Sequence, residues 1–281
     1  MSADVFARGP AWLFCPADRP DRYAKAAAAA DVVIIDLEDG VPGSRRPRAR
    51  ELVLAAADAL DPDTTVLRVS PVRTRDHEAD LALLFSLPIT TVMLAKAEQA
   101  AQLTRLRTVQ VVALCETPLG VLDAGSIARA DNCAGLMWGA EDLVAATGGS
   151  SSRHEDGSYR DLARHALAQV LPAASAAGGP ALDAVVLALD DVQAVEREAV
   201  DAAASGFAGK ACIHPRQTAV VRAACRPTDA HTGWARAVLE AADQEGREGG
   251  AFAFRGQMID EPVLRLARRI LARAGHPPQR D

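Results

Sequence analysis

The sequence lacks the features that mark membrane, secreted and nucleic-acid-binding proteins. No run of about 18 apolar residues occurs in the chain, and its first residues lack a basic stretch followed by an apolar one. We therefore expect a cytoplasmic protein with no membrane partner. The 31 basic and 37 acidic residues form no long run of one sign, which gives no electrostatic reason to expect nucleic acid as a partner.

Cysteine and lysine are scarce in the sequence, and glycine-rich nucleotide-binding motifs are absent from the expected position. The five cysteines lack the close spacing of a metal site, so we interpret them as reduced core residues. Neither GxGxxG nor GxxxxGK[ST] follows the first predicted strand, which excludes the usual dinucleotide and P-loop motifs. Lysine occurs only as Lys25, Lys96 and Lys210. A lysine that persists in such an arginine-rich chain is a candidate for a role that needs a compact ammonium group, with chance as the alternative.

What the sequence does contain is a repeated alternation of short apolar runs and longer helical segments. The predicted strands are Ala11–Pro16, Val32–Asp36, Thr65–Val69, Thr91–Ala95, Gln110–Cys115, Gly135–Gly139, Ala184–Leu189 and Lys210–His214. The predicted helices include Asp21–Ala30, Arg48–Leu60, Glu78–Phe85, Ala97–Arg107, Tyr159–Ala177 and Val192–Ala204. Eight alternations over about 215 residues favour an α/β fold, a (β/α)₈ TIM barrel, over an open doubly wound sheet.

The chain continues beyond the eighth predicted strand. A helical segment at Gly233–Gln244, an aromatic and glycine stretch at Ala251–Asp260 and a helix at Glu261–Ala274 exceed what closing a barrel needs. We predict a barrel domain at 1–226 and a C-terminal helical extension at 227–281, which covers the barrel end or contacts a neighbouring subunit. The stretch Gly148–Ser158 favours irregular backbone and is a candidate lid over the site.

Polar residues cluster where the predicted strands end. In TIM barrels the reacting groups lie at the carboxyl ends of the strands, so these side chains should meet at one mouth. They are Asp36, Glu38 and Asp39, then Arg68 and Ser70, Lys96, Glu116, Glu141 and Asp142, and His214. Buried carboxylates need cations nearby, and carboxylate oxygens without thiols or paired histidines suit magnesium. Glu116 and Asp142 are the candidate ligands, with helix capping or an exposed loop position as the alternative.

The same segments resemble the citrate lyase beta-subunit and malyl-CoA lyase family of the HpcH/HpaI aldolase/citrate lyase superfamily. The resemblance runs in family order over nearly the whole chain. It rests on LFCPADRPDRYAKA, DVVIIDLEDGVPGSRRPRAREL, VLRVS, VMLAKAE, VVALCETPLGVLDA, GLMWGAEDLVAATG, GFAGKACIHPRQT and GQMIDEPVLRLA. Each motif alone is weak, whereas the ordered set is specific.

The resemblance implies a Mg²⁺-dependent carbon–carbon lyase, with Mn²⁺ as a possible substitute, that is commonly a homotrimer. It implies that Glu116 and Asp142 bind the metal and that Arg68 binds the 2-oxo acid. It also implies that Asp260 enters the active site of the next subunit as the acid–base residue, with capping of the final helix as the alternative. The further substrate-binding candidates are Glu141, Phe14, Arg19, Lys25, Ile213 and His214.

The chemistry requires the same kinds of residue. Cleaving a β-hydroxyacyl thioester between its α and β carbons generates a thioester enolate and a ketone carbonyl, and both need stabilising. Arg68 can donate to the oxygen where charge develops. Asp36, Glu38, Asp39 and Lys96 are candidates for an outer layer that orders Arg68 and the metal. Lys210, before the eighth strand, is assigned a structural role at the opposite end of the barrel.

The predicted reaction converts a CoA thioester, such as citramalyl-CoA or malyl-CoA, into an acyl-CoA and a 2-oxo acid, pyruvate or glyoxylate. Three alternatives stay open: a citrate lyase subunit that acts on a citryl-carrier-protein thioester to give oxaloacetate, a CoA-independent class II pyruvate aldolase, and a non-enzymatic barrel that keeps the pocket. Ala17, Ser70 and Ala95 depart from the family's usual glycine, asparagine and proline. These departures leave the substrate less defined than the reaction type.

Overall fold

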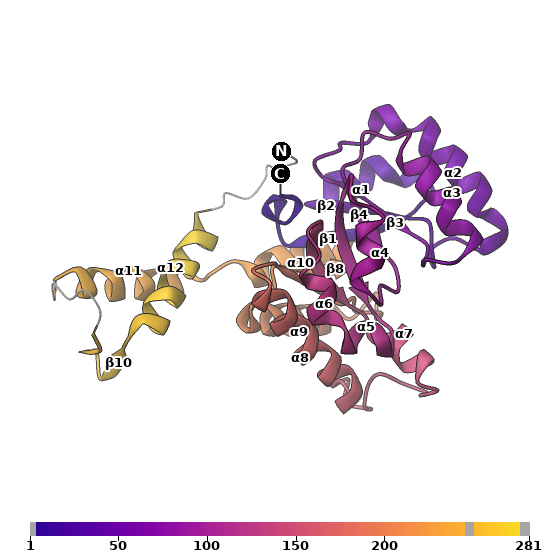
Figure 1. Ribbon diagram of the computed structural model, residues 1–281. Coiled ribbons are helices and arrows are strands. Elements are labelled where there is room, and N and C mark those ends of the chain that lie inside the picture. Colours follow the sequence, from indigo (N-terminus) through magenta and orange to yellow (C-terminus); the bar gives the residue numbers. More distant parts are fainter. Residues whose placement is uncertain (1–3, 245–249, 276–281) are drawn as a thin grey trace. The chain divides into compact units, whose positions relative to one another are not determined.

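The computed structural model describes residues 4–244 and 250–275, and its contacts divide the chain into two units between Arg222 and Ala223. In the first unit, eight parallel strands pair in sequence order and close into a barrel with helices around it (Figure 1). The predicted α/β TIM-barrel fold is therefore confirmed. The predicted domain border after residue 226 and a contact of the extension with a neighbouring subunit stay predictions.

Most of the barrel strands begin and end close to their predicted positions. The strands are β1 Ala11–Pro16, β2 Val32–Asp36, β3 Thr65–Val69, β4 Thr91–Leu94, β5 Gln110–Cys115, β6 Cys133–Trp138, β7 Ala181–Asp183 and β8 Gly209–Cys212. Four of them, β1, β2, β3 and β5, have the predicted bounds. Short apolar runs are therefore a good guide to most strands of this barrel wall, and several of these strands are buried along their whole length.

The predicted seventh strand, Ala184–Leu189, is wrong. Strand β7 lies just before it, where Leu182 pairs with Met137 of β6 and with Gly209 of β8. The following apolar run has no strand partners, and Leu187 and Leu189 are exposed. An apolar run alone cannot distinguish a buried strand from an exposed loop, because hydrogen bonding to the neighbouring strands decides which residues enter the sheet.

Helices follow the strands around the barrel. They are α1 Tyr23–Ala29, α2 Arg46–Ala55, α3 Arg75–Leu84, α4 Ala100–Thr104, α5 Pro118–Leu122, α6 Ala124–Ala128, α7 Ala140–Ala146, α8 Asp161–Ala176, α9 Val192–Ser205 and α10 Pro215–Cys225. Short 3₁₀ helices are η1 Val5–Arg8, η2 Pro20–Arg22, η3 Gly43–Arg45 and η4 Ala57–Ala59. Among the described helices, none combines the length and the apolar character that crossing a membrane requires.

The barrel interior is filled by apolar side chains that alternate along the strands. The buried cluster consists of Val5, Trp12, Val32, Ile34, Val66, Met93, Val112, Leu114, Met137, Leu182 and Ala211. Since side chains two residues apart in a strand share a face, the residue two positions after a member of this cluster also faces inward. This rule places Asp36, Arg68 and Glu116 above Ile34, Val66 and Leu114.

The second unit has a small core of its own. Helix α11 Asp229–Gln244 packs with α12 Glu261–Ala274, and the antiparallel strands β9 Phe252–Phe254 and β10 Gln257–Ile259 lie between them in the sequence. The hairpin turn uses Arg255 at φ 47° and Gly256 at φ 79°, as a two-residue turn with left-handed backbone requires. The core of this unit is built around Ala235, Val238, Ile259 and Ala267.

Candidate active site

Arg68 and Asp36 form a doubly hydrogen-bonded pair at the carboxyl end of the barrel. Arg68 donates from Nε to Asp36 Oδ1 and from NH2 to Asp36 Oδ2, both at 2.7 Å. Its guanidinium also lies 4.9 Å from the ring centre of Phe14. Burial alone would lower the pKa of Arg68, but the charge of Asp36 and its hydrogen bonds raise it. The Arg68 guanidinium is therefore always charged. Its two bonds to Asp36 hold it in one orientation, in which NH1 is the nitrogen directed away from Asp36.

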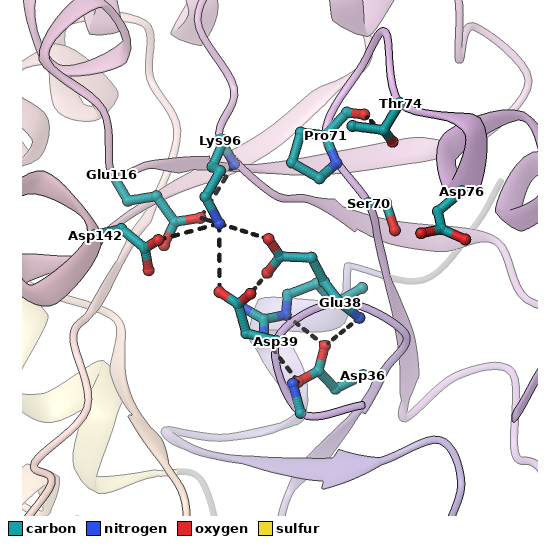
Figure 2. Close-up of polar contacts among 12 residues, drawn as sticks. Asp36, Glu38, Asp39, Ser70, Pro71, Thr74, Asp76, Lys96, Glu116 and Asp142 are labelled. Atoms are coloured by element: carbon teal, nitrogen blue, oxygen red, sulfur yellow. Dashed lines mark hydrogen bonds and ion pairs between the residues drawn. The ribbon is translucent and has the colours of Figure 1, made fainter. Parts of the chain in front are cut away.

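Glu38 lies beside this pair. The backbone amides of Glu38 and Gly40 donate to the two carboxylate oxygens of Asp36, at 2.9 and 2.8 Å. Glu38 Oε2 lies 3.2 Å from Arg68 NH1, and the Glu38 side chain also contacts that of Asp39 (Figure 2). Burial raises the pKa of Glu38, although Arg68 and Lys96 oppose the shift. A buried carboxylate oxygen with spare capacity can accept a hydrogen bond from a bound molecule.

Lys96 stands among the carboxylates of this cluster (Figure 2). Its Nζ lies 2.5 Å from Glu38 Oε1, 3.1 Å from Asp142 Oδ1, 3.3 Å from Asp39 Oδ2 and 4.0 Å from Glu116 Oε1. The pKa of Lys96 is raised because these carboxylates outweigh the opposing effect of burial. Its backbone is left-handed, with φ 50°, a conformation that non-glycine residues rarely adopt and that is most often found at functional sites.

Glu116 and Asp142 lie close together, each after one of two adjacent strands (Figure 2). Glu116 follows β5 and is buried, and its Oε1 accepts a hydrogen bond from the backbone N–H of Lys96 at 3.1 Å. Asp142 lies in the first turn of α7, after β6. Burial raises the pKa of Glu116 to about 8, and the nearby charge of Asp142 adds to the shift. Two neighbouring carboxylates, one of them buried, repel each other, and a bound cation relieves that repulsion.

The residues present fit a hard divalent cation. Gly139 lies beside Glu116, and a Cβ on Gly139 would come within 2.9 Å of Glu116 Cβ and 3.0 Å of its Oε2. The glycine therefore leaves room for the carboxylate to face the barrel axis. Among residues 4–244 and 250–275, no group of three His, Cys, Asp or Glu side chains could hold a metal by itself. One or two carboxylates completed by water and substrate oxygens are usual for Mg²⁺, so the pair is sufficient.

The structure brings together most of the polar residues predicted to meet at the mouth. The connected set is Asp36, Glu38, Asp39, Arg68, Lys96, Glu116 and Asp142. Glu141 accepts a hydrogen bond from Ser152 instead, at 2.6 Å. The backbone amides of Ile213 and His214 donate to Gln217 Oε1 at 2.9 and 3.3 Å, which fixes the turn after β8.

Three predicted residues have other surroundings. Arg19 pairs with Asp21 on the surface at 2.7 Å, and Lys25 is exposed on α1. Asp260 belongs to the second unit, where its Oδ1 accepts from the backbone N–H of Val263 at 3.3 Å and caps α12. The capping role is therefore present, and it leaves the other carboxylate oxygen for a further contact. The role of Asp260 in the active site stays a prediction.

A set of arginine–aspartate ion pairs lies behind the site and was not predicted from the sequence. Arg46 pairs with Asp76 at 2.8 Å and donates to the backbone carbonyl of Glu38 at 3.1 Å. Arg50 pairs with Asp80 at 2.7 Å, and Asp80 accepts from the N–H of Ser70 at 2.9 Å. Arg46 and Arg50, like Asp76 and Asp80, are four residues apart and share a helix face. That spacing was the signal available in the sequence.

A closed (β/α)₈ barrel with charged side chains gathered at the carboxyl ends of its strands is the architecture of a TIM-barrel enzyme. The model of the HpcH/HpaI aldolase/citrate lyase family matches residues 11–215, and the chain belongs to this family. It is accordingly a carbon–carbon lyase.

Individual relatives agree with this assignment. The citrate lyase subunit beta-like protein of Mycobacterium tuberculosis is 55% identical over 269 residues, which cover 96% of this chain and 97% of the relative. The mitochondrial citramalyl-CoA lyase of Mus musculus is 28% identical over 272 residues, covering 87% and 79%. A crystal structure of M. tuberculosis CitE with magnesium, acetoacetate and coenzyme A is 54% identical, with a TM-score of 0.92 and coverage of 96% and 100%.

Proposed function

We propose that the protein is a Mg²⁺-dependent lyase that cleaves a β-hydroxyacyl-CoA into an acyl-CoA and a 2-oxo acid. The observation that carries the proposal is the meeting of Arg68 with the Glu116 and Asp142 carboxylates at one barrel mouth. A relative of high structural similarity was crystallised with magnesium, a keto acid and coenzyme A. The substrate, the homotrimer and the cytoplasmic location belong to this proposal.

Glu116 and Asp142 would hold the metal. When bound, Mg²⁺ supplies Lewis acidity and a template for the oxygens of the 2-oxo acid portion. The elevated pKa of Glu116 reflects burial together with repulsion from Asp142, and a divalent cation relieves that repulsion. Glu141 is the neighbouring substrate-binding candidate, and Mn²⁺ is the expected substitute because it accepts the same oxygen ligands.

Arg68 would stabilise the oxygen at which charge develops. As the carbon–carbon bond breaks, the hydroxyl group of the substrate releases its proton to solvent and its oxygen becomes a ketone oxygen, and the bonding electrons pass to the α carbon of the thioester. Asp36 holds the Arg68 fork by two hydrogen bonds of 2.7 Å, so little reorganisation is needed when the charge forms. One such preorganised donor is worth about 3 kcal/mol in comparable sites.

Asp260 would supply the proton that the α carbon of the acyl-CoA takes up. This role requires Asp260 to enter the active site of a neighbouring subunit, which makes a homotrimer part of the proposal. Phe14, Arg19, Lys25, Ile213 and His214 would contact the coenzyme A thioester. Arg19 is half-buried and Lys25 is exposed, both after the end of β1, and such cationic side chains can bind phosphate groups.

The test is to measure release of acetyl-CoA or propionyl-CoA from citramalyl-CoA, malyl-CoA and β-methylmalyl-CoA. Each assay is run with Mg²⁺ and with a chelator. Metal-dependent cleavage of any member is the expected result and identifies the substrate group. Absence of turnover across the panel would contradict the proposal and favour a carrier-protein thioester or a CoA-independent aldol reaction.

A further inference from the structure

The loop of residues 148–160, between α7 and α8, has a defined shape of its own. The backbone N–H of His154 donates to the Ser158 carbonyl at 2.8 Å, and that of Arg160 donates to the Ser152 carbonyl at 2.8 Å. Arg153 and Tyr159 form an isolated antiparallel bridge. A sequence rich in glycine and serine therefore folds here into a hydrogen-bonded loop rather than an irregular one.

Ser152 joins this loop to the metal-binding helix. Its side chain is buried, and its Oγ donates to Glu141 Oε1 at 2.6 Å. Glu141 and Asp142 are adjacent residues in the first turn of α7. The position of Ser152 therefore bears directly on the turn that presents the Asp142 carboxylate.

Arg153 fastens the loop to the barrel's helical layer. Its NH1 lies 2.6 Å from Glu198 Oε1 of α9 and donates to the Gly157 carbonyl at 2.8 Å. The guanidinium also stacks 3.8 Å from the ring centre of Tyr159. Gly157 and Tyr159 fix the Arg153 side chain within the loop, and Glu198 links the loop to α9.

Glu198, the partner of Arg153 on α9, belongs to a buried cluster of charged side chains. Lys210 of β8 is buried, and its Nζ lies 2.7 Å from Asp183 Oδ2 and 3.1 Å from Glu198 Oε2. Asp183 Oδ1 accepts a hydrogen bond at 2.7 Å from the indole N–H of Trp138, the last residue of β6. Removing one partner from such a buried cluster leaves a charge unpaired, so the cluster resists movement.

These contacts hold both ends of the short segment Trp138–Asp142. Asp183 holds Trp138 at the start of the segment, and Ser152 holds Glu141 beside Asp142 at its end. The segment also contains Gly139, which lies against Glu116. The loop and the buried cluster thus converge on the turn that sets the separation of the two carboxylates.

We propose that the 148–160 loop is a positioning device for the metal site, with Ser152 acting through Glu141 to set Asp142. The inference rests on the proposed function, since it takes Glu116 and Asp142 as the metal ligands. Outer partners of metal ligands typically change metal affinity by about tenfold to a hundredfold. A purely structural hydrogen bond would change stability and leave the affinity of the folded protein alone.

The experiment measures Mn²⁺ affinity by electron paramagnetic resonance in the full-length protein. Ser152→Ala is compared with Ser158→Ala, which makes the same change in the same loop at an exposed side chain bonded only to Asp156. We expect Ser152→Ala to bind Mn²⁺ about tenfold more weakly, with kcat at saturating metal little changed. Ser158→Ala should match the wild type.

A second variant tests the route through Glu141. Since Ser152 is proposed to act through Glu141, the double variant Glu141→Ala/Ser152→Ala should bind Mn²⁺ no more weakly than Glu141→Ala alone. Glu141 is exposed, so its replacement leaves the fold intact and keeps the test available even if Ser152→Ala unfolds. Equal Mn²⁺ affinity of Glu141→Ala and the wild type overturns the inference, as does equal affinity of Ser152→Ala and Ser158→Ala.

The wild type and Asp142→Asn separate this inference from the proposed function. If the wild type does not bind Mn²⁺, or Asp142→Asn binds it equally well, the proposed metal site is wrong. If binding depends on Asp142 but not on Ser152, the metal site stands and the positioning role alone is wrong.

Discussion

Arg68 illustrates how a single side chain can be committed to one geometry before any ligand arrives. Two of its nitrogens donate to Asp36, and the ring of Phe14 lies against the guanidinium. A lysine at this position would carry the same charge but could not form the paired bonds, because an ammonium group is a point donor without a planar fork.

We therefore predict that Arg68→Lys lowers kcat by about a hundredfold or more, the effect of losing one preorganised donor to a developing oxyanion. Steady-state kinetics at saturating Mg²⁺ measures the change, and circular dichroism checks that the variant remains folded. A folded Arg68→Lys enzyme with kcat near the wild-type value would show that charge alone is enough.

Gly139 offers a second prediction at the scale of one residue. Its backbone φ is −136°, which alanine adopts without strain, so only the added Cβ matters. That atom would lie 2.9 Å from Glu116 Cβ and would push the carboxylate aside. We expect Gly139→Ala to weaken Mn²⁺ binding by about tenfold, by analogy with other disturbed metal sites.

The matched control for Gly139→Ala is Gly43→Ala, because a Cβ at Gly43 meets no atom within 4 Å. Isothermal titration with Mn²⁺ compares the two variants with the wild type. Unchanged affinity in Gly139→Ala would mean that Glu116 does not need the space that the glycine leaves.

At the scale of elements, helices α2 and α3 are linked by arginine–aspartate ion pairs. Hydrogen bonds from Arg50, against a smaller effect of burial, and from Arg46 hold the pKa of Asp76 below its ordinary value. A lowered carboxyl pKa in the folded state contributes stability above the unfolded value and loses that contribution as pH falls through the folded value.

We predict that the stability advantage of the wild type over Asp76→Asn is full above about pH 5 and shrinks below about pH 4. Since the pair is partly exposed, the difference in Tm should be only about 2 °C. Thermal melts between these pH values measure it, and Asp58→Asn on exposed η4 is the control. A difference that grows toward low pH would refute the assignment.

The elements also show which parts of the site the sequence could predict. Asp36, Arg68 and Glu116 were predictable, because each follows an inward-facing residue by two positions in a strand of clear apolar character. The end of β7 was not predictable, because its apolar run continues into an exposed loop. The spacing of apolar residues shows which side chains of a strand face the barrel interior. The hydrogen bonds to neighbouring strands determine where the strand ends.

The individual contacts at the barrel mouth depend on how the loops after the strands fold. Lys96, after β4, lies near Glu38 after β2 and Asp142 after β6, although β4 pairs with neither of those strands. Lys210, for which the sequence predicts a structural role at the opposite end of the barrel, pairs with Ala11 at the start of β1, and its ammonium donates to the carboxylate of Asp183. The Ser152 contact lies in a stretch whose composition predicted only irregular backbone.

At the scale of the whole molecule, the proposed role of Asp260 makes a quantitative prediction. If Asp260 acts in a neighbouring subunit, a Glu116→Gln chain and an Asp260→Asn chain are each inactive alone but can form a complete site together. Mixing and exchanging the two proteins should restore up to about a quarter of wild-type activity per site for random mixing, because both the metal-binding chain and the Asp260 donor must be intact at one site.

The complementation experiment is read by activity after co-refolding the two variants in equal amounts. The control mixes Glu116→Gln with Asp142→Asn, which place both defects on the same proposed metal site and should remain inactive. Absence of activity in the first mixture, with native size by light scattering, would indicate that Asp260 acts within its own chain or has no catalytic role.

The carboxylates around Lys96 have a consequence for the order in which molecules bind. In the part of the chain that the structure describes, the five acidic side chains Asp36, Glu38, Asp39, Glu116 and Asp142 lie around two cationic ones, Arg68 and Lys96. A coenzyme A thioester of a carboxylic acid is itself strongly anionic, so it would approach a mouth of like charge. A divalent cation that binds first reduces the excess of negative charge at the mouth, which makes the apparent affinity for the thioester a function of metal concentration. The proposed enzyme is thus expected to follow an ordered kinetic scheme in which metal precedes substrate.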